Sequence, residues 1–259
     1  MPFAEIGELR LHYTLGGAAG APVVVLSNSL GTNFSMWDPQ TPALAKQFRV
    51  LQYDTRGHGQ SSVTPGPYGV ELLGRDVLGL LDFLRLDRVH FCGLSLSGLT
   101  GMWLGVHAAG RLNKLVLCNT AAKIGTLETW NARIESVRRD GMQAIASAAI
   151  ERWFTPEFRA DAPDAVATAQ RMIEETPPEG YAGCCAAVRD FDFREALAAI
   201  RLPTLVISGT RDPATPTADG RFLAQRIAGA QFAELPTSHL SNFEAPEQFT
   251  STLIRFLTS

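Results

Sequence analysis

The chain has 259 residues, 46% of them hydrophobic and 19% charged, so it can bury one large core and is neither disordered nor fibrous. Its formal net charge of -3 provides no broad positive field, which argues against nucleic acid and anionic membrane surfaces as partners. No apolar run approaches the roughly 18 to 20 residues of a membrane span, and the first residues lack the features of a signal peptide, so we expect a cytoplasmic protein.

The first half of the chain alternates predicted strands and helices. Residues 3–15 alternate apolar and polar side chains around Gly7, which predicts a hairpin. The continuous β-branched run at 23–26 is typical of a strand that is covered on both faces. The further elements predicted in this half are a helix over 38–47, a strand over 48–53, a helix over 71–85, a strand from 89, a helix over 97–109 and a strand over 114–118.

From about 122 to 200 the strand signal disappears, and helical spacing is interrupted at Pro177-Pro178. A strand over 204–208, a helix over 217–228, a strand over 231–235 and a helix over 246–258 follow. This order predicts an α/β fold, a mostly parallel sheet of about eight strands with helices on both faces. We expect residues 1–121 and 201–259 to form its core and residues 122–200 to form an inserted helical cap over the carboxyl edge of the sheet.

Ser95 is the first candidate for chemistry. It follows an apolar run, and the small residues Gly93 and Ser97 flank it at minus two and plus two, as a sharp strand-to-helix turn requires. The pattern usually has glycine where Ser97 stands. The alternative is an ordinary turn with a serine near a helix N-terminus.

A serine nucleophile needs a base and a carboxylate that orients the base. His239 follows the last predicted strand on a polar loop, and Asp212 follows the strand over 204–208, although a turn aspartate there could be structural. The order Ser, Asp, His along the chain is that of α/β-hydrolases. Three other histidines are interpreted as structural: His12, His90 and His107. His58 remains a competing candidate for the base.

The developing oxyanion also needs hydrogen-bond donors. We expect one from the backbone N–H of Leu96, directly after the nucleophile, and one from the backbone of Leu30, in the loop of small residues after the strand at 23–26. The four cysteines are interpreted as reduced, mostly buried thiols and no metal site is expected: Cys92, Cys118, Cys184 and Cys185.

Several motifs together resemble the 3-oxoadipate enol-lactonases of the α/β-hydrolase superfamily. They lie at 27–32 (Ser-Asn-Ser-Leu-Gly-Thr), 36–40 (Met-Trp-Asp-Pro-Gln), 54–61 (Asp-Thr-Arg-Gly-His-Gly-Gln-Ser), 93–95, 129–133 (Thr-Trp-Asn-Ala-Arg) and 238–244 (Ser-His-Leu-Ser-Asn-Phe-Glu). The motif that contains Arg56 and His58 is shared with many α/β-hydrolases and is usually structural. The first and the last of these motifs are narrower, and they favour the lactonases.

The resemblance implies a serine hydrolase that opens 3-oxoadipate enol-lactone to 3-oxoadipate in the catabolism of protocatechuate and catechol, with an acyl-enzyme on Ser95 and no cofactor. A carboxylesterase or a cofactor-free haloperoxidase-like hydrolase would use the same triad, and a ligand receptor of the same fold is the alternative outside enzymes. The sequence leaves open whether the chain forms a homo-oligomer.

The implied substrate is a small anion, so a protein with net negative charge must bind its carboxylate locally. Arg133 beside Trp130 is the first candidate, because guanidinium pairs well with carboxylate. Trp153 is expected to wall the pocket or to pack in the cap. The other cap arginines considered are expected to be solvated: Arg138, Arg139 and Arg152.

Overall fold

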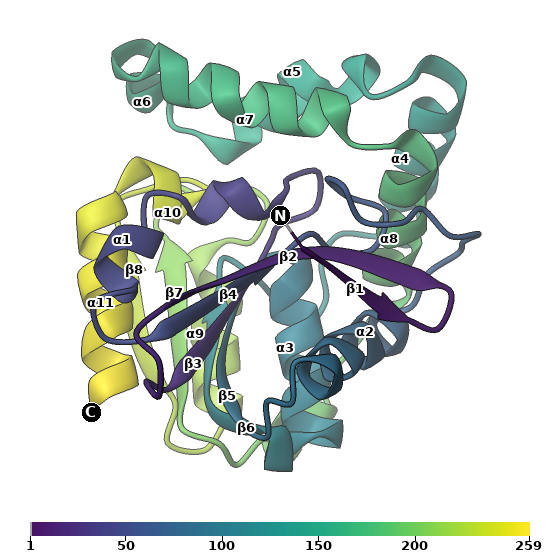
Figure 1. Ribbon diagram of the computed structural model, residues 1–259. Coiled ribbons are helices and arrows are strands. Elements are labelled where there is room, and N and C mark those ends of the chain that lie inside the picture. Colours follow the sequence, from purple (N-terminus) through teal and green to yellow (C-terminus); the bar gives the residue numbers. More distant parts are fainter. Residues whose placement is uncertain (1) are drawn as a thin grey trace.

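The computed structural model describes residues 2–259, and these form an eight-stranded sheet in the order β1-β2-β4-β3-β5-β6-β7-β8 (Figure 1). The strands are β1 (Phe3–Ile6), β2 (Leu9–Gly17), β3 (Val23–Ser27), β4 (Arg49–Tyr53), β5 (Val89–Leu94), β6 (Leu112–Cys118), β7 (Thr204–Gly209) and β8 (Gln231–Leu235). β1 and β2 form the predicted antiparallel hairpin, and β2 also runs antiparallel to β4. All other strand pairs are parallel.

The three strands β3, β5 and β7 are buried at every residue, which explains their continuous apolar runs. The helices outside the long insertion are α1 (Thr41–Leu44), α2 (Val70–Phe83), α3 (Leu96–His107), α9 (Thr217–Arg226), α10 (Ser241–Glu244) and α11 (Pro246–Thr258). α2 packs against α3, α3 against β5 and β6, and α9 against β7 and β8, while α1 packs against α11. Of the helices in residues 2–259, none combines the length and apolar character needed to cross a membrane.

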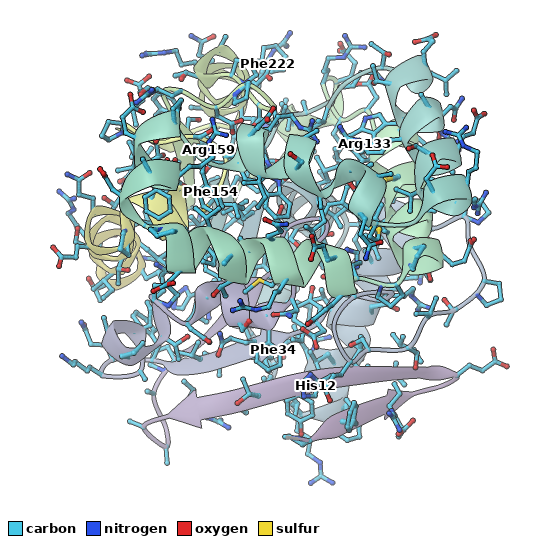
Figure 2. All side chains as sticks on the ribbon, turned by 90° about the horizontal axis from the view of Figure 1, so that it is seen from above. His12, Phe34, Arg133, Phe154, Arg159 and Phe222 are labelled. Atoms are coloured by element: carbon cyan, nitrogen blue, oxygen red, sulfur yellow. The ribbon has the colours of Figure 1, made fainter. Side chains whose placement is uncertain are left out.

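Five α-helices lie between β6 and β7, and we call this segment, residues 127–190, the helical insertion. They are α4 (Leu127–Asp140), α5 (Gln143–Trp153), α6 (Pro156–Asp161), α7 (Pro163–Glu175) and α8 (Pro178–Asp190). α6, α7 and α8 each begin with proline, whose missing N–H is tolerated in a first turn. α5, α6 and α7 extend over one end of the sheet (Figures 1 and 2), so the helical insertion covers that end.

The prediction of one helix over 38–47 is wrong. A short 3₁₀ helix at Phe34–Trp37 comes first, a turn follows at 38–40, and α1 covers only Thr41–Leu44. Pro42 cannot donate an N–H to the carbonyl of Asp38, so a continuous helix is interrupted there and α1 starts with this proline in its first turn. α3 begins one residue earlier than predicted and ends two residues earlier, at His107.

Candidate active site

Ser95 occupies a strained turn between β5 and α3. Its backbone has φ 56° and ψ -112°, which a residue with a side chain rarely adopts and which costs on the order of 1–3 kcal/mol. A Cβ at Gly93 would lie 2.2 Å from the carbonyl oxygen of Ser97, so glycine is required there. The sheet therefore holds Ser95 at the carboxyl end of β5, in the wall of a cavity.

Ser97 stands where the motif usually has glycine, and the structure gives its hydroxyl a role. Its Oγ donates to the carbonyl of Asn28 at 2.5 Å and accepts a hydrogen bond from Ser27 Oγ at 2.7 Å. Both partners lie at the start of the loop that contains Leu30. Because Ser97 is fully buried and bonded on both sides, it is not a competing nucleophile; it ties the Ser95 turn to that loop.

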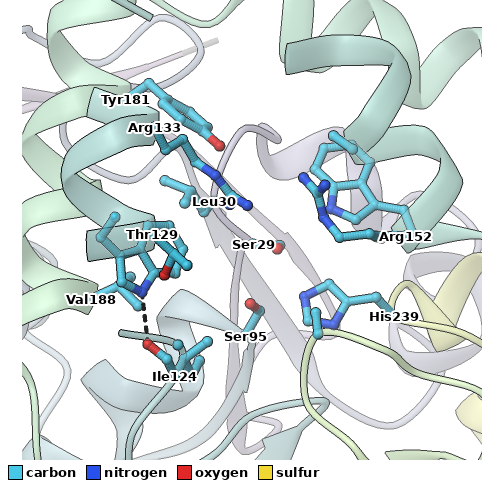
Figure 3. A pocket seen from close by; sticks show the side chains of 15 residues that line it. Ser29, Leu30, Ser95, Ile124, Thr129, Arg133, Arg152, Tyr181, Val188 and His239 are labelled. Carbon is cyan, nitrogen blue, oxygen red and sulfur yellow. Dashed lines mark hydrogen bonds between the residues drawn. The ribbon is translucent and has the colours of Figure 1, made fainter. Parts of the chain in front are cut away.

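Asp212 and His239 come together behind Ser95, although 27 residues separate them in the chain. His239 Nδ1 lies 2.8 Å from Asp212 Oδ2. The Ser95 hydroxyl faces the His239 ring, and both residues line the same cavity (Figure 3). A carboxylate on Nδ1 favours the tautomer in which Nε2 is free to accept a proton from the serine.

Asp212 is held ionised by its neighbours. Burial acts to raise the pKa of this carboxyl, but the charge on His239 and the hydrogen bonds to the carboxylate outweigh burial and leave the pKa below its ordinary value. Oδ2 also accepts from Thr215 Oγ1 at 2.7 Å and from Asn119 Nδ2 at 3.1 Å. Oδ1 accepts from the backbone N–H groups of Ala214 at 2.8 Å and Thr215 at 3.1 Å.

Sequence reasoning did not single out Asn119. This residue follows β6 directly and has a positive φ of 43°, and its Nδ2 donates both to Asp212 and to the carbonyl of Ser238, next to His239. Ser241 Oγ donates to its Oδ1 at 2.6 Å and fixes the orientation of the amide. A polar side chain at the carboxyl end of a central parallel strand was the signal that could have identified it.

The backbone N–H groups of the two predicted oxyanion donors are unpaired in the part of the chain that the structure describes. Within residues 2–259, the N–H groups of Leu30 and Leu96 have no hydrogen-bond acceptor, and Leu96 opens α3. The next N–H along, that of Gly31, donates to His58 Nε2 at 3.0 Å, and His58 Nδ1 donates to the carbonyl of Arg56 at 3.2 Å. His58 thus contacts the loop that carries Leu30, and its structural role stays a prediction.

His58 must stay neutral to accept that hydrogen bond. Burial lowers its pKa to about 4, although the Arg56 carbonyl and the charge of Asp54 oppose the change. The Gly31 bond to His58 therefore persists at neutral pH.

The cavity in front of Ser95 has a volume of about 230 Å³. This is below the roughly 300 to 1,000 Å³ of pockets for drug-sized ligands, so the site suits a small metabolite. The predicted residues Leu30, Trp130, Arg133 and Trp153 all line it.

Two arginines project into this cavity from different helices of the insertion, Arg133 from α4 and Arg152 from α5 (Figure 3). Arg133 also lies over the Trp130 ring, 4.7 Å from its centroid. Burial lowers the pKa of Arg152, and the positive charge of Arg133 lowers it further. Within residues 2–259 neither guanidinium has a carboxylate within ion-pair distance, so the cavity carries local positive charge.

The expectation that Arg152 is solvated is wrong, because it lines the cavity and is half-buried. Its position next to Trp153 was a usable signal, since Arg133 likewise follows Trp130 closely. Arg138 and Arg139, in contrast, are exposed and pair with Glu179 and Asp140. Tyr181 is a further residue that the sequence did not single out, and its phenol lies beside Arg133 (Figure 3).

The four cysteines are free and buried. Among residues 2–259, no group of three or more His, Cys, Asp or Glu side chains is arranged to hold a metal ion.

Comparisons with known proteins identify the family of the chain. Residues 22–246 match the model of the alpha/beta hydrolase fold family. The chain is 45% identical to 3-oxoadipate enol-lactonase 2 of Acinetobacter baylyi over 242 residues, 93% of this chain and 91% of that protein. It is 43% identical to 3-oxoadipate enol-lactonase 1 of the same organism over 249 residues, 96% of this chain and 93% of that protein.

The crystal structure of the enol-lactonase from Burkholderia xenovorans LB400 superposes with a TM-score of 0.98 at 48% identity, covering 100% of both chains. The predicted fold class and the resemblance inferred from the motifs are therefore confirmed. The chain belongs to the α/β-hydrolase fold family, in the group formed by the 3-oxoadipate enol-lactonases.

Proposed function

We propose that this chain is a serine hydrolase that opens 3-oxoadipate enol-lactone to 3-oxoadipate, as the names of its relatives state for those proteins. One observation carries the proposal beyond family membership. A small cavity holds Ser95 facing His239 on one side and, on the other, two arginines that have no carboxylate partner within residues 2–259. That combination suits a small ester or lactone that also carries a carboxylate group.

The first half of the reaction acylates Ser95. His239 Nε2 takes the hydroxyl proton as Oγ attacks the lactone carbonyl, and Asp212 stabilises the imidazolium that forms. The carbonyl oxygen becomes an oxyanion held by the N–H groups of Leu30 and Leu96. When the C–O bond of the ring breaks, His239 returns the proton to the leaving enol oxygen, and the enol then ketonises.

The second half releases the acid. His239 takes a proton from water, the resulting hydroxide attacks the acyl carbonyl on Ser95, and the same two N–H groups hold the second oxyanion. The ester bond to Ser95 Oγ breaks, and His239 gives the proton back to that oxygen. The sum is one lactone and one water converted to 3-oxoadipate, and the protein residues end in their starting state.

Residues 122–200 act as the cap over this site, with residues 2–121 and 201–259 as the core. Arg133 and Arg152 bind the substrate carboxylate, because a guanidinium presents paired donors to a carboxylate and because each lacks an acidic partner in residues 2–259. Trp130 and Trp153 form apolar walls that exclude water and strengthen this attraction. The substrate is thus a small anionic lactone.

A substrate panel tests the proposal. Purified protein is assayed with 3-oxoadipate enol-lactone, followed by the loss of its ultraviolet absorbance, with uncharged lactones of similar size, and with p-nitrophenyl acetate. We expect kcat/KM to be highest for the anionic lactone by at least about a hundredfold, with turnover above about 1 per second. Preference for the uncharged esters would indicate a carboxylesterase, and binding without turnover would indicate a receptor.

A further inference from the structure

The loop that carries the catalytic base is fastened to the helical insertion. Ser238 Oγ donates to the carbonyl of Arg152 at 2.7 Å, and the N–H of Leu240 donates to the carbonyl of Trp153 at 3.0 Å. Ser238 and Leu240 are the two neighbours of His239 in the chain. The residues on both sides of His239 are therefore hydrogen-bonded to Arg152 and Trp153, the last two residues of α5, whose side chains line the cavity.

One carboxylate, that of Glu244, completes this connection. Its Oε1 accepts from the backbone N–H of Thr155 at 2.7 Å and from Thr155 Oγ1 at 2.6 Å. Its Oε2 accepts from the backbone N–H of Ser238. Three donors from two separate segments thus converge on a single ionised group, and hydrogen bonds to an ionised acceptor are the stronger kind.

The short helix α10 holds Glu244 in place. The backbone N–H of Glu244 donates to the carbonyl of Leu240 at 3.2 Å, which folds the chain back toward the His239 loop. Asn242, two residues earlier, donates through Nδ2 to the carbonyl of Met36 at 2.7 Å and anchors α10 to the core. Phe243 packs edge-on against Phe154 of the insertion, with ring centroids 5.9 Å apart.

We propose that Glu244 is a positioning residue that joins His239 to the part of the cavity wall formed by Arg152 and Trp153. Arg152 has two ends in this arrangement, a guanidinium in the cavity and a carbonyl on the His239 loop. One hydrogen-bonded unit, formed by Arg152, Thr155, Ser238 and Glu244, thereby sets two things. It sets the contact of Arg152 with a bound anion, and it sets the position of His239. This inference rests on the proposed function, since it assigns a partner to the base and the anion site of that function.

Replacing Glu244 by Gln tests the connection with little change in size. An amide keeps one accepting oxygen, so it can serve either Thr155 or the N–H of Ser238, and its NH2 group opposes the donor at the other end. Whichever end is lost, the His239 loop and the insertion are no longer joined through this group. Glu247→Gln is the matched control. Glu247 is an exposed glutamate that lines the same surface groove as Thr155 and Glu244, and its side chain has no hydrogen bond within residues 2–259.

The first readout is the rate at which a serine-directed fluorophosphonate labels Ser95, together with kcat for p-nitrophenyl acetate. Both are normalised to the fraction of sites that finally become labelled, so a loss of folded protein does not change them. We expect Glu244→Gln to lower both about ten- to hundredfold, because a displacement of about 1 Å can cost about a hundredfold. Glu247→Gln should stay within about twofold of the parent.

The second readout is a double-mutant cycle with Arg152→Ala and the anionic lactone. If the unit exists, Arg152→Ala raises KM in the parent chain at least about threefold more than in the Glu244→Gln background, whereas effects of independent sites multiply. The same cycle with Glu247→Gln should show multiplicative effects.

Labelling and ester rates of Glu244→Gln within twofold of the parent, or a multiplicative cycle, would overturn the proposal. If Glu244→Gln does not fold, Ser238→Ala decides, since it removes only the bond to the Arg152 carbonyl; labelling slowed at least about threefold supports the unit, and a smaller effect refutes it. If the parent does not turn over the lactone, the proposed function fails, while labelling and ester hydrolysis still test Glu244.

Discussion

Asp212→Asn is the substitution for which the structure gives the most definite expectation. Oδ1 of Asp212 accepts two backbone N–H groups, those of Ala214 and Thr215. An asparagine must place its oxygen there, because its NH2 group would oppose both donors. The NH2 group then points toward His239 and toward Asn119 Nδ2, which is itself a donor.

His239 responds by changing tautomer. With an NH2 group opposite, Nδ1 becomes the acceptor, and the proton moves to Nε2, which faces Ser95 and can no longer accept the serine proton. The corresponding change in a serine protease costs about ten-thousandfold in kcat, which equals about 5.4 kcal/mol at about 1.36 kcal/mol per factor of ten. Opposed donors at Asn119 cost a further 1–3 kcal/mol or so of folding stability.

The assay is kcat for the enol-lactone and for p-nitrophenyl acetate, with urea unfolding to measure the free energy of unfolding. Asp87→Asn is the control, because Asp87 is exposed and precedes β5, at the opposite end of that strand from Ser95, and we expect its kcat within about twofold of the parent. A loss below about tenfold in Asp212→Asn would show that another group orients His239.

The remaining predictions concern the loop and the cavity. His58 is buried neutral, with its pKa lowered from 6.5 to about 4, so the unfolded chain binds more protons between these values and stability falls as pH drops through this window. Between pH 7 and pH 5 the free energy of unfolding falls by about 2 kcal/mol through this group. His58→Gln keeps an acceptor for the N–H of Gly31, and its urea unfolding should lack that part of the pH dependence. Identical pH profiles for the variant and the parent would refute this prediction. Arg133→Ala and Arg152→Ala should each raise KM for the anionic lactone about tenfold or more, since a charge-assisted hydrogen bond contributes about 1.5–3 kcal/mol. The same substitutions should raise KM for p-nitrophenyl acetate less than about twofold. Equal effects on both substrates would exclude a role in binding the carboxylate.

Much of the fold could be predicted because its signals are local. The run at 23–26 is apolar at every position since both faces of β3 are covered, and the run before Ser95 has the same cause. The failure at 38–47 is also local, because Pro42 interrupts a continuous helix there.

The site was predictable as far as residues at the ends of strands go. Ser95, Asp212 and His239 each follow a strand, and parallel strands bring their carboxyl ends to one edge of the sheet, where the three side chains meet. The same rule would have identified Asn119, which follows β6.

The wall of the cavity was harder to predict. Which arginine enters it depends on how α4 and α5 pack over the sheet, and the neighbouring Trp153 is the one local feature that distinguishes Arg152 from Arg138 and Arg139. Glu244 contacts Thr155, 89 residues earlier, so the motif at 238–244 could be recognised but its connection to the insertion could not.

Comparing Ser95→Ala with the parent chain on 3-oxoadipate enol-lactone tests the central claim most directly. The parent should consume the lactone at more than about 1 per second and yield 3-oxoadipate. Ser95→Ala should stay folded and lose at least about a thousandfold of that rate, since the remaining donors and binding contacts cannot replace the nucleophile. A parent without lactone turnover, or a Ser95→Ala variant with near-normal turnover, would contradict the account.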